Sequence, residues 1–374
     1  MKASKGRSIG TRNDRSHPVL AVSMGDMNGI GPEVILKMLP ELVQSTEGSS
    51  AGILLFASRD AMLRCFPTVF PGLPPPAWLA TPKQENWQYI GSSLFPSDPA
   101  NLPVPEPSEI ILVPSHGDEE PCEPGRITGF SGKLSMEAVA AGIDACLSGS
   151  ADAIVTGPIS KEAIHLGGYN VPGHTEYLAE RTGAREVGMM LVNDAMRIGL
   201  ATIHVPLCDV SGMITPDLIQ TRLKLYSRTL AADFGISRPR IAVLGLNPHA
   251  GDGGVLGSEE REIIEPALQK LRDDGMNVSG PWPADGFFGS GGHKEADLVL
   301  AMYHDQGLIP LKLAGFGGGV NVTAGLPIIR TSPDHGTAFP LAGRNMAHAR
   351  SMLSAALLAL DMIRRRQATN PEPR

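Results

Sequence analysis

Residues 18–39 read PVLAVSMGDMNGIGPEVILKML, and this stretch decides the fold class. An apolar run typical of a buried strand is followed by a glycine-bearing turn. A helix comes next, with Pro32 in its first turn, where proline is favoured because its missing N–H has no partner there in any case. The order of strand, tight turn and helix predicts an α/β protein.

The same alternation continues along the chain. Periods of two and of about 3.6 residues mark further strands and helices. Expected strands cover 52–58, 109–115, 151–158, 187–193, 197–206, 240–248 and 296–304, and expected helices cover 59–66, 132–149, 215–235, 258–275 and about 345–366. Alternating elements predict mostly parallel sheets covered by helices.

Composition excludes several classes of protein. The net charge is −7 and no long block of like charges occurs, which argues against a partner such as nucleic acid or a membrane surface. The four cysteines are scattered, which indicates a reducing compartment such as the cytoplasm. Residues 1–17 are polar and basic without an apolar core, so we expect a disordered leader rather than a secretory signal. The proline-rich stretch 66–108 is expected to be irregular.

Polar signatures follow the expected strands. They are GDMNGIGP, TGPISK, TIHVP, LNPHAG and MYHDQG. In open α/β sheets, ligands bind beyond the carboxyl ends of the strands. Their common position therefore indicates one shared cleft.

Three histidines, His204, His249 and His304, close expected strands. A single histidine at a strand end is more often structural than a ligand, and the separations match no local metal motif. Their common position makes ligation plausible, because three neutral imidazoles would suit Zn²⁺ or a similar ion acting as a Lewis acid.

Two segments carry candidate anion sites. His174 and Thr175 lie at an expected helix start, where backbone N–H groups bind anions, although from this segment alone a simple helix cap is the better explanation. The glycine-rich stretch 311–343 carries Lys312, Asn321 and Arg330, which would bind a phosphate or a carboxylate unless the glycines form only a flexible turn. GDMNGIGP does not match the dinucleotide-binding fingerprint, so Asp26 and its neighbours are interpreted as a turn that shapes a cleft wall.

Together these segments resemble the 4-hydroxythreonine-4-phosphate dehydrogenase family, over about residues 18–366. The combination of LNPHAG, MYHDQGL and DHGTA in this order is specific. The resemblance implies two α/β/α lobes with mostly parallel sheets and a central cleft, similar to isocitrate and isopropylmalate dehydrogenases. The expected parts are a first lobe on the cofactor side (18–165 with 315–367), a second lobe with metal, substrate and dimer interface (166–314) and a polar tail (368–374).

The resemblance also implies roles for individual residues. His204, His249 and His304 would hold one divalent ion (zinc, magnesium, cobalt or manganese), with one ligand coming from the partner subunit of a homodimer. The substrate contacts would be His174, Thr175, Lys312, Asn321 and Arg330. The loop of His335, Gly336, Thr337 and Ala338 would lie against the adenosine side of NAD or NADP. Asp285, Asp305 and Lys312 are the candidate catalytic groups, and a metal-linked water is an alternative acceptor of the proton.

The implied reaction is oxidation of the secondary hydroxyl of 4-phosphooxy-L-threonine, then decarboxylation to an aminoacetone phosphate, in pyridoxal phosphate biosynthesis. Three departures bear on the substrate: Met27-Asn28 replaces proline-alanine, Gly318 replaces an arginine and Gly286 replaces a threonine. They leave open a dehydrogenase of the same family that acts on phosphorylated threonate or erythronate, or on an aromatic cis-dihydrodiol acid. A phosphoacyl-transfer enzyme without a nicotinamide and a non-enzymatic metabolite-binding module are the alternatives from other classes.

Overall fold

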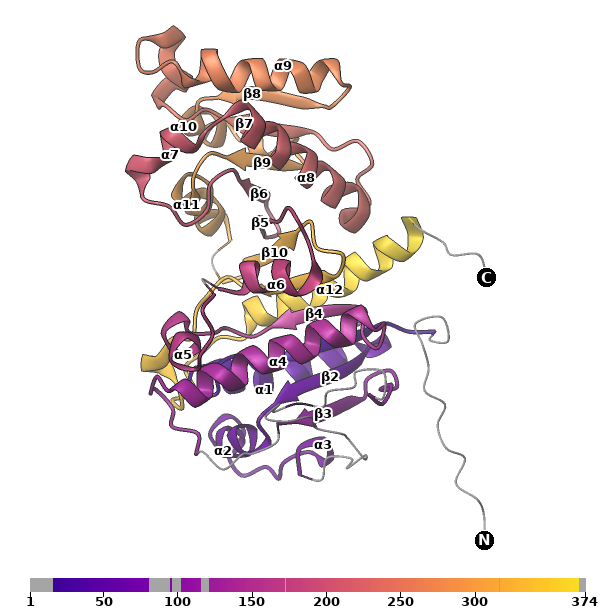
Figure 1. Ribbon diagram of the computed structural model, residues 1–374. Helices are drawn as coiled ribbons and strands as arrows, with labels where there is room; N and C mark the ends of the chain where they lie inside the picture. Colours follow the sequence, from indigo (N-terminus) through magenta and orange to yellow (C-terminus); the bar gives the residue numbers. More distant parts are fainter. Residues whose placement is uncertain are drawn as a thin grey trace. The chain divides into compact units, whose positions relative to one another are not determined.

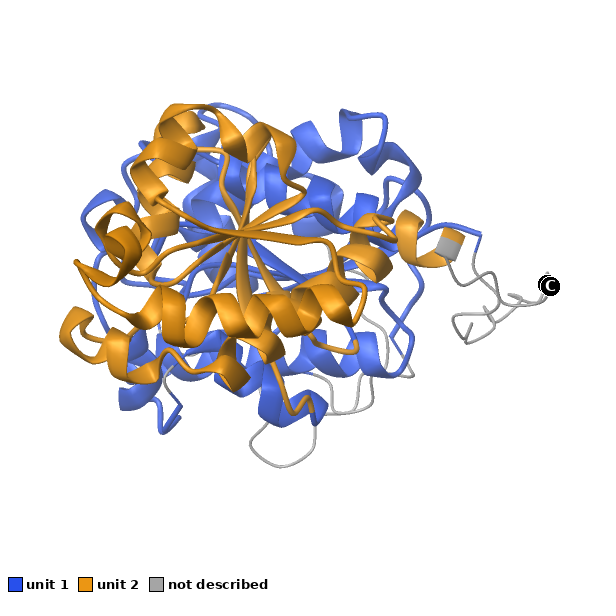
Figure 2. Cartoon of the chain, turned by 90° about the horizontal axis from the view of Figure 1, so that it is seen from above, with its two compact units in different colours: residues 1–183, 328–363 blue, residues 184–327, 364–374 orange. Residues whose placement is uncertain are grey.

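The computed structural model describes residues 16–80, 95, 102–115, 121–171, 173–315 and 317–369. Most of the expected leader and tail, and part of the 66–108 stretch, lie outside the described residues. The chain divides into two compact units (Figure 2). Unit 1 comprises Met1–Gly183 with Ile328–Ile363, and unit 2 comprises Ala184–Pro327 with Arg364–Arg374.

Two segments group differently from the expected lobes, for visible reasons. Helix α6 (His174–Thr182) belongs to unit 1 because it packs on α4 (Gly129–Leu147), where Arg181 forms an ion pair of 2.5 Å with Asp144. Strand β10 (Val320–Ala324) belongs to unit 2 because it pairs antiparallel with β5 (Gly188–Val192). The central cleft between the lobes stays a prediction.

Unit 1 is built on five parallel strands in the order β3-β2-β1-β4-β11. Helix α4 contacts β1, β2 and β4 and runs across one face of this sheet (Figure 1). Its strands are β1 (Val19–Ser23), β2 (Gly52–Ala57), β3 (Ile110–Pro114), β4 (Ala153–Thr156) and β11 (Ile329–Pro333). Its other helices are α1 (Gly31–Gln44), α2 (Arg59–Val69), α3 (Ala77–Ala80), α5 (Lys161–Leu166) and most of α12 (Arg350–Thr369).

The opening stretch of the sequence folds as expected. All five residues of β1 are buried, and α1 begins at Gly31 with proline in its first turn. Gly25 has a φ of 76°, and a side chain there would collide with the carbonyl of Pro158. The turn is therefore held against the loop that follows β4.

Unit 2 contains six strands in the order β10-β5-β6-β9-β7-β8. Strand β5 runs antiparallel to β10 and β6, and β6, β9, β7 and β8 are mutually parallel. The remaining strands are β6 (Arg197–Leu200), β7 (Ile241–Leu244), β8 (Val278–Trp282) and β9 (Leu298–Ala301). The helices are α7 (Leu207–Met213), α8 (Pro216–Phe234), α9 (Glu265–Asp273), α10 (Ala284–Gly289) and α11 (His304–Ala314), with short helical turns η4 (Pro248–Gly254), η5 (Glu260–Ile264) and η6 (Gly292–Glu295). The prediction of an α/β protein with mostly parallel strands is confirmed.

Helices cover both faces of the unit 2 sheet (Figure 2). Alternation along β6 shows this directly, because a side chain at Gly199 would meet the ring of Tyr226 in α8. Its neighbours Ile198 and Leu200 instead face Gly307 of α11. Among the described residues, no helix has both the length and the apolar composition needed to cross a membrane.

Several expected strands are shorter in the structure. Strand β6 ends at Leu200 rather than 206, β7 ends at Leu244 rather than 248, and β9 ends at Ala301 rather than 304. The three histidines therefore lie in the segments that follow the strands, and His304 is the first residue of α11.

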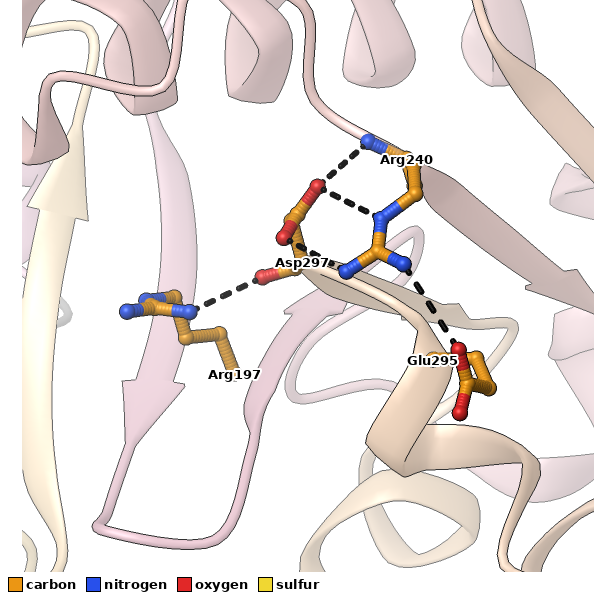
Figure 3. Close-up of polar contacts among 4 residues, drawn as sticks. All are labelled: Arg197, Arg240, Glu295 and Asp297. Carbon is orange, nitrogen blue, oxygen red and sulfur yellow. Dashed lines mark hydrogen bonds and ion pairs between the residues drawn. The ribbon is translucent and has the colours of Figure 1, made fainter.

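A cluster of charged side chains fixes the opposite, amino ends of these strands (Figure 3). Asp297, just before β9, accepts hydrogen bonds from the backbone N of Arg240 at 2.7 Å and from its Nε at 3.3 Å. Arg197 donates to the carbonyl oxygen of Asp297, and Arg240 also forms an ion pair with Glu295. Burial acts to raise the pKa of Asp297, but the bonds from Arg240 outweigh it and lower the pKa. This cluster joins β6, β7 and β9 and leaves their carboxyl ends for the candidate site.

Candidate functional site

His204 and His304 lie together at the carboxyl end of the unit 2 sheet. Their ring centroids are 5.6 Å apart and their planes are inclined by 42°. Two imidazoles on one tetrahedral zinc ion would have centroids roughly 5 Å apart, given Zn–N bonds of about 2 Å. The spacing of this pair thus fits ligation of a single ion.

The pairing follows from the sheet. Strands β6 and β9 are parallel neighbours, so the segments after them leave the same edge. Their registration continues past the strands, because Thr202 donates from its backbone N at 3.2 Å and from its Oγ1 at 2.7 Å to the carbonyl of Met302. His204 and His304 each follow this hydrogen-bonded pair, Thr202 and Met302, by two residues.

Asp305 lies directly against His304. Its Oδ1 is 2.7 Å from Nδ1 of the imidazole. A carboxylate at one ring nitrogen fixes the tautomer and orientation of an imidazole that binds a metal through the other nitrogen. A carboxylate in this position is placed to support His304, and the role of Asp305 as a proton acceptor stays a prediction.

His249 lies in η4 with an exposed side chain. Within the part of the chain that the structure describes, no three His, Cys, Asp or Glu side chains come together as a metal-binding group. The structure therefore unites two of the three expected ligands, and ligation by all three stays a prediction. Asp285, also exposed, is in the first turn of α10, which contacts η4.

Unit 1 contains a buried cation. Arg330 in β11 is only 2% exposed, and it donates from Nε at 3.2 Å and from Nη2 at 2.7 Å to Oγ1 of Thr156 in β4. Burial lowers the pKa of Arg330 to about 9. A guanidinium in such a place favours binding of an anionic group.

His174 is the first residue of α6 and interacts electrostatically with Arg330. Burial, and then that charge, lower the pKa of His174 well below its usual value. Its Nε2 is buried and has no hydrogen-bond partner among the described residues. Gly173 is the N-cap, so Thr175 is the second helical residue rather than the cap itself. A helix N-terminus, an imidazole nitrogen without a partner among the described residues and a buried arginine are groups that suit a phosphate, and their role as substrate contacts stays a prediction.

Lys312 and Asn321 belong to unit 2. Lys312 is exposed in the last turn of α11. Asn321 is in β10, and its Oδ1 is buried without a hydrogen-bond partner among the described residues. Both lie beside the glycine-rich segment, and their role as substrate contacts stays a prediction.

The loop of His335, Gly336, Thr337 and Ala338 follows β11 and packs against the opening turn of the chain. The carbonyl of Thr337 accepts a hydrogen bond of 2.9 Å from the backbone N of Ile30, and a side chain at Gly29 would lie 2.8 Å from the same oxygen. Nε2 of His335 is buried without a partner among the described residues, and the space around Gly336 is open. These features fit a loop that receives a polar ligand such as the adenosine part of a nucleotide.

Asp26 is a buried carboxyl group whose character the sequence did not reveal. Its Oδ1 accepts from the backbone N of Asn28 at 3.0 Å, and its Oδ2 accepts from the hydroxyl of Ser131 at 3.2 Å. Burial outweighs these bonds and raises the pKa of Asp26 to about 6. The signal that could have found it is an acidic residue in a turn between a buried strand and a helix.

Comparison with known proteins agrees with these features. Residues 85–359 match the family model described as pyridoxal phosphate biosynthetic protein PdxA. The 4-hydroxythreonine-4-phosphate dehydrogenase of Chromobacterium violaceum is 44% identical over 345 residues, which cover 91% of this chain and 96% of that protein.

Solved structures point the same way. A 4-hydroxythreonine-4-phosphate dehydrogenase from Klebsiella pneumoniae has a TM-score of 0.74 and 36% identity, covering 93% of this chain and 100% of that one. A terephthalate 1,2-cis-dihydrodiol dehydrogenase from Burkholderia xenovorans is less similar, with a TM-score of 0.59 and 28% identity over 92% of this chain and 98% of that one. The chain belongs to the 4-hydroxythreonine-4-phosphate dehydrogenase family, as the motifs in its sequence predicted.

Proposed function

We propose that this protein is an oxidoreductase that oxidises the secondary hydroxyl of 4-hydroxythreonine-4-phosphate, with loss of CO₂ to give an aminoacetone phosphate, in pyridoxal phosphate biosynthesis. The relatives of that name, at 36% and 44% identity, support this substrate over the dihydrodiol acid, whose dehydrogenase is 28% identical. Phosphorylated threonate or erythronate is likewise less favoured, because neither relative bears such a name.

The observation that carries the chemistry is the pair of imidazoles from His204 and His304 with Asp305 behind the second ring. Together with His249 they would hold one divalent ion, which when bound acts as a Lewis acid on the substrate hydroxyl. Neutral imidazoles suit zinc, whereas magnesium, cobalt and manganese are the alternatives. A homodimer that completes the ligand set from the partner subunit belongs to the same proposal.

The other residues hold the substrate and the cofactor. Arg330 and the start of α6 at His174 and Thr175 would bind the phosphate, because charge and helix N-terminus act on the same anion. Lys312 and Asn321 would contact the remaining polar groups. The loop from His335 to Ala338 would receive the adenosine side of NAD or NADP, which supplies the hydride acceptor when bound.

Two groups remain as proton acceptors. Asp285 is exposed. Its carboxylate has no hydrogen-bond partner among the described residues that would compete with acceptance of the proton. Lys312, in the last turn of α11, is the other candidate. We favour Asp285, because Asp305 is engaged with His304.

The test is a substrate panel with the purified full chain. Reduction of NAD⁺ and of NADP⁺ is followed with 4-hydroxythreonine-4-phosphate, a phosphorylated threonate and an unphosphorylated dihydrodiol acid, each with Zn²⁺, Mg²⁺, Co²⁺ or Mn²⁺. We expect the highest kcat/KM with the first substrate and loss of activity after chelation. Activity that survives chelation would contradict the role of the metal, and preference for another panel member would contradict the substrate.

A further inference from the structure

The segment that carries His249 has an unusual backbone. Five consecutive residues of η4, from His249 to Gly253, are left-handed, with φ of 53°, 51°, 82°, 44° and 67°. Three of them, His249, Ala250 and Asp252, have side chains that disfavour this region. Such a turn persists only where the surrounding structure holds it, and strain of this kind gathers at functional sites.

The side chain of Glu260 holds the start of this turn. It is 5% exposed, and its Oε1 accepts hydrogen bonds of 2.7 Å from the backbone N of both Leu246 and Asn247. Its Oε2 accepts a third, of 3.0 Å, from Nδ2 of Asn247. Oε2 of Glu259 accepts a further bond of 2.7 Å from the same Nδ2, but only the Glu260 carboxylate accepts from the backbone N of both residues that lead from β7 into the turn, among the contacts of the described residues.

The same carboxylate lies against the turn itself. A side chain at Gly251 would come within 2.7 Å of Oε2 of Glu260, and one at Gly245 would come within 3.1 Å of Oε1. The two glycines therefore let the carboxylate sit between the end of β7 and the middle of the turn. Glu260 also opens η5, a single π-helical turn, and such turns are frequent beside functional sites.

A second side chain connects this loop with the one that carries His304. Nε2 of Gln306 donates to the carbonyl of Gly245 at 2.7 Å, and its Oε1 accepts from the backbone N of Met302 at 2.6 Å. Gly245 follows β7, and Met302 precedes the first turn of α11. The placement of the His249 turn is thereby linked to the segment that presents His304.

We propose that Glu260 is a positioning residue, which presents the imidazole of His249 for metal binding by holding the left-handed turn. The inference rests on the proposed function, because His249 is a ligand only there. If the loop served only for packing, glycine at positions 249, 250 and 252 would allow the same backbone without strain. A loop that served only for packing would also not need a buried carboxylate that accepts three hydrogen bonds.

The experiment compares Glu260→Ala and Glu260→Gln with Glu262→Ala in the full chain. Glu262 is a matched control, because it lies in the same helical turn but is exposed, and its carboxylate accepts hydrogen bonds from Ser258 and Arg261. The Kd for Zn²⁺ alone is measured by chelator competition. Amide hydrogen exchange of residues 246–257 is measured in the metal-free protein, together with Tm.

We expect Glu260→Ala to weaken Zn²⁺ binding by about 10- to 100-fold, the range typical of outer-shell partners of metal ligands. Exchange in 246–257 should accelerate. Glu260→Gln should rescue part of the loss, because its amide oxygen still accepts from Leu246 and Asn247 while its NH₂ group opposes Nδ2 of Asn247. If Glu260→Ala does not fold, the Glu260→Gln comparison carries the test alone.

The outcomes separate the two proposals. If the wild type binds Zn²⁺ and both Glu260 variants bind it with the same Kd, the positioning role is overturned and the proposed function stays intact. Zinc binding that survives His249→Ala, or a wild type that binds none of Zn²⁺, Mg²⁺, Co²⁺ and Mn²⁺, would overturn the ligand assignment and the positioning role with it. A loss of affinity equal in Glu262→Ala would also overturn the proposal, because the effect would then not be specific to Glu260.

Discussion

Oδ1 of Asp305 lies 2.7 Å from Nδ1 of His304, in the first turn of α11. A hydrogen bond at Nδ1 leaves Nε2 as the ring nitrogen available to a ligand and restricts rotation of the ring. The two neighbours in sequence thus act as one unit, in which the carboxylate orients the imidazole. This relationship gives the first prediction.

Asp305→Asn should weaken Zn²⁺ binding by about 10- to 100-fold, because the amide cannot stabilise the same ring state as well as the carboxylate. Excess metal should restore much of the activity, since the ligand itself remains. Asp209→Asn, an exposed change in α7, is the control. An unchanged Kd for Zn²⁺ in Asp305→Asn would refute the supporting role.

Arg330→Lys should raise the KM for the phosphorylated substrate by at least about tenfold, which corresponds to roughly 1.4 kcal/mol. Lysine keeps the positive charge but cannot reproduce the planar guanidinium that donates to Thr156 and that, in our proposal, binds the phosphate. Competitive inhibition by inorganic phosphate should weaken in parallel. Arg228→Lys, at an exposed position of α8, should change neither quantity. A rise in KM without weaker phosphate inhibition would argue against a phosphate contact.

The strand–turn–helix unit at 18–39 could be predicted because its signals are local: a buried apolar run, a glycine turn and a proline at a helix start. Strand ends could not be predicted in the same way. The apolar residues Ile203 and Leu246 continue the pattern past Leu200 and Leu244, where the strands end. Strands β10 and β11 were missed because the many glycines of 311–343 weaken any two-residue period.

The candidate site was predictable to a similar degree. The position of His204, His249 and His304 after expected strands predicted one shared cleft. The structure brings His204 and His304 together because β6 and β9 are parallel neighbours, and ligation by all three stays a prediction. The environment of Asp26 depends on Ser131, which is distant in the chain, and that of Glu260 depends on how the segment after β7 folds back onto η5. No local pattern records either contact. Gly307, whose absence of a side chain brings α11 onto β6, is of the same kind.

Asp26 leads to a prediction about pH. Burial raises its pKa to about 6 in the folded protein, above the model-peptide value near 3.8. The folded state therefore binds the proton more tightly than the unfolded state. The contribution to stability is fully present below about pH 4 and is lost as pH rises towards 6.

Asp26→Asn should remove this dependence. Relative to the variant, the free energy of unfolding of the wild type should fall by up to roughly 3 kcal/mol between pH 4 and pH 7, at 1.36 kcal/mol per pKa unit. Urea denaturation across this range measures it. Asp194→Asn, at an exposed turn, should leave the wild-type profile unchanged. Parallel profiles for wild type and Asp26→Asn would contradict the raised pKa.

The packing of α11 on the sheet gives the last prediction. A side chain at Gly307 would collide with Cγ2 of Ile198 and lie 3.0 Å from Cβ of Ala301, both in buried strands. Gly307→Ala should therefore force α11 outward and lower the free energy of unfolding by about 1–3 kcal/mol, the usual range for overpacking.

Gly286→Ala is its matched control, because Gly286 is also helical, in α10, and a side chain there meets nothing within 4 Å. This change should be neutral or should stabilise by up to about 1 kcal/mol, since alanine favours the helix over glycine. Because α11 begins at His304, Gly307→Ala should also weaken Zn²⁺ binding, whereas Gly286→Ala should not. Denaturation midpoints and zinc affinities of the two variants separate the cases. Equal stability of both variants would mean that α11 can shift without cost, and the proximity of His304 to His204 would then not depend on this contact.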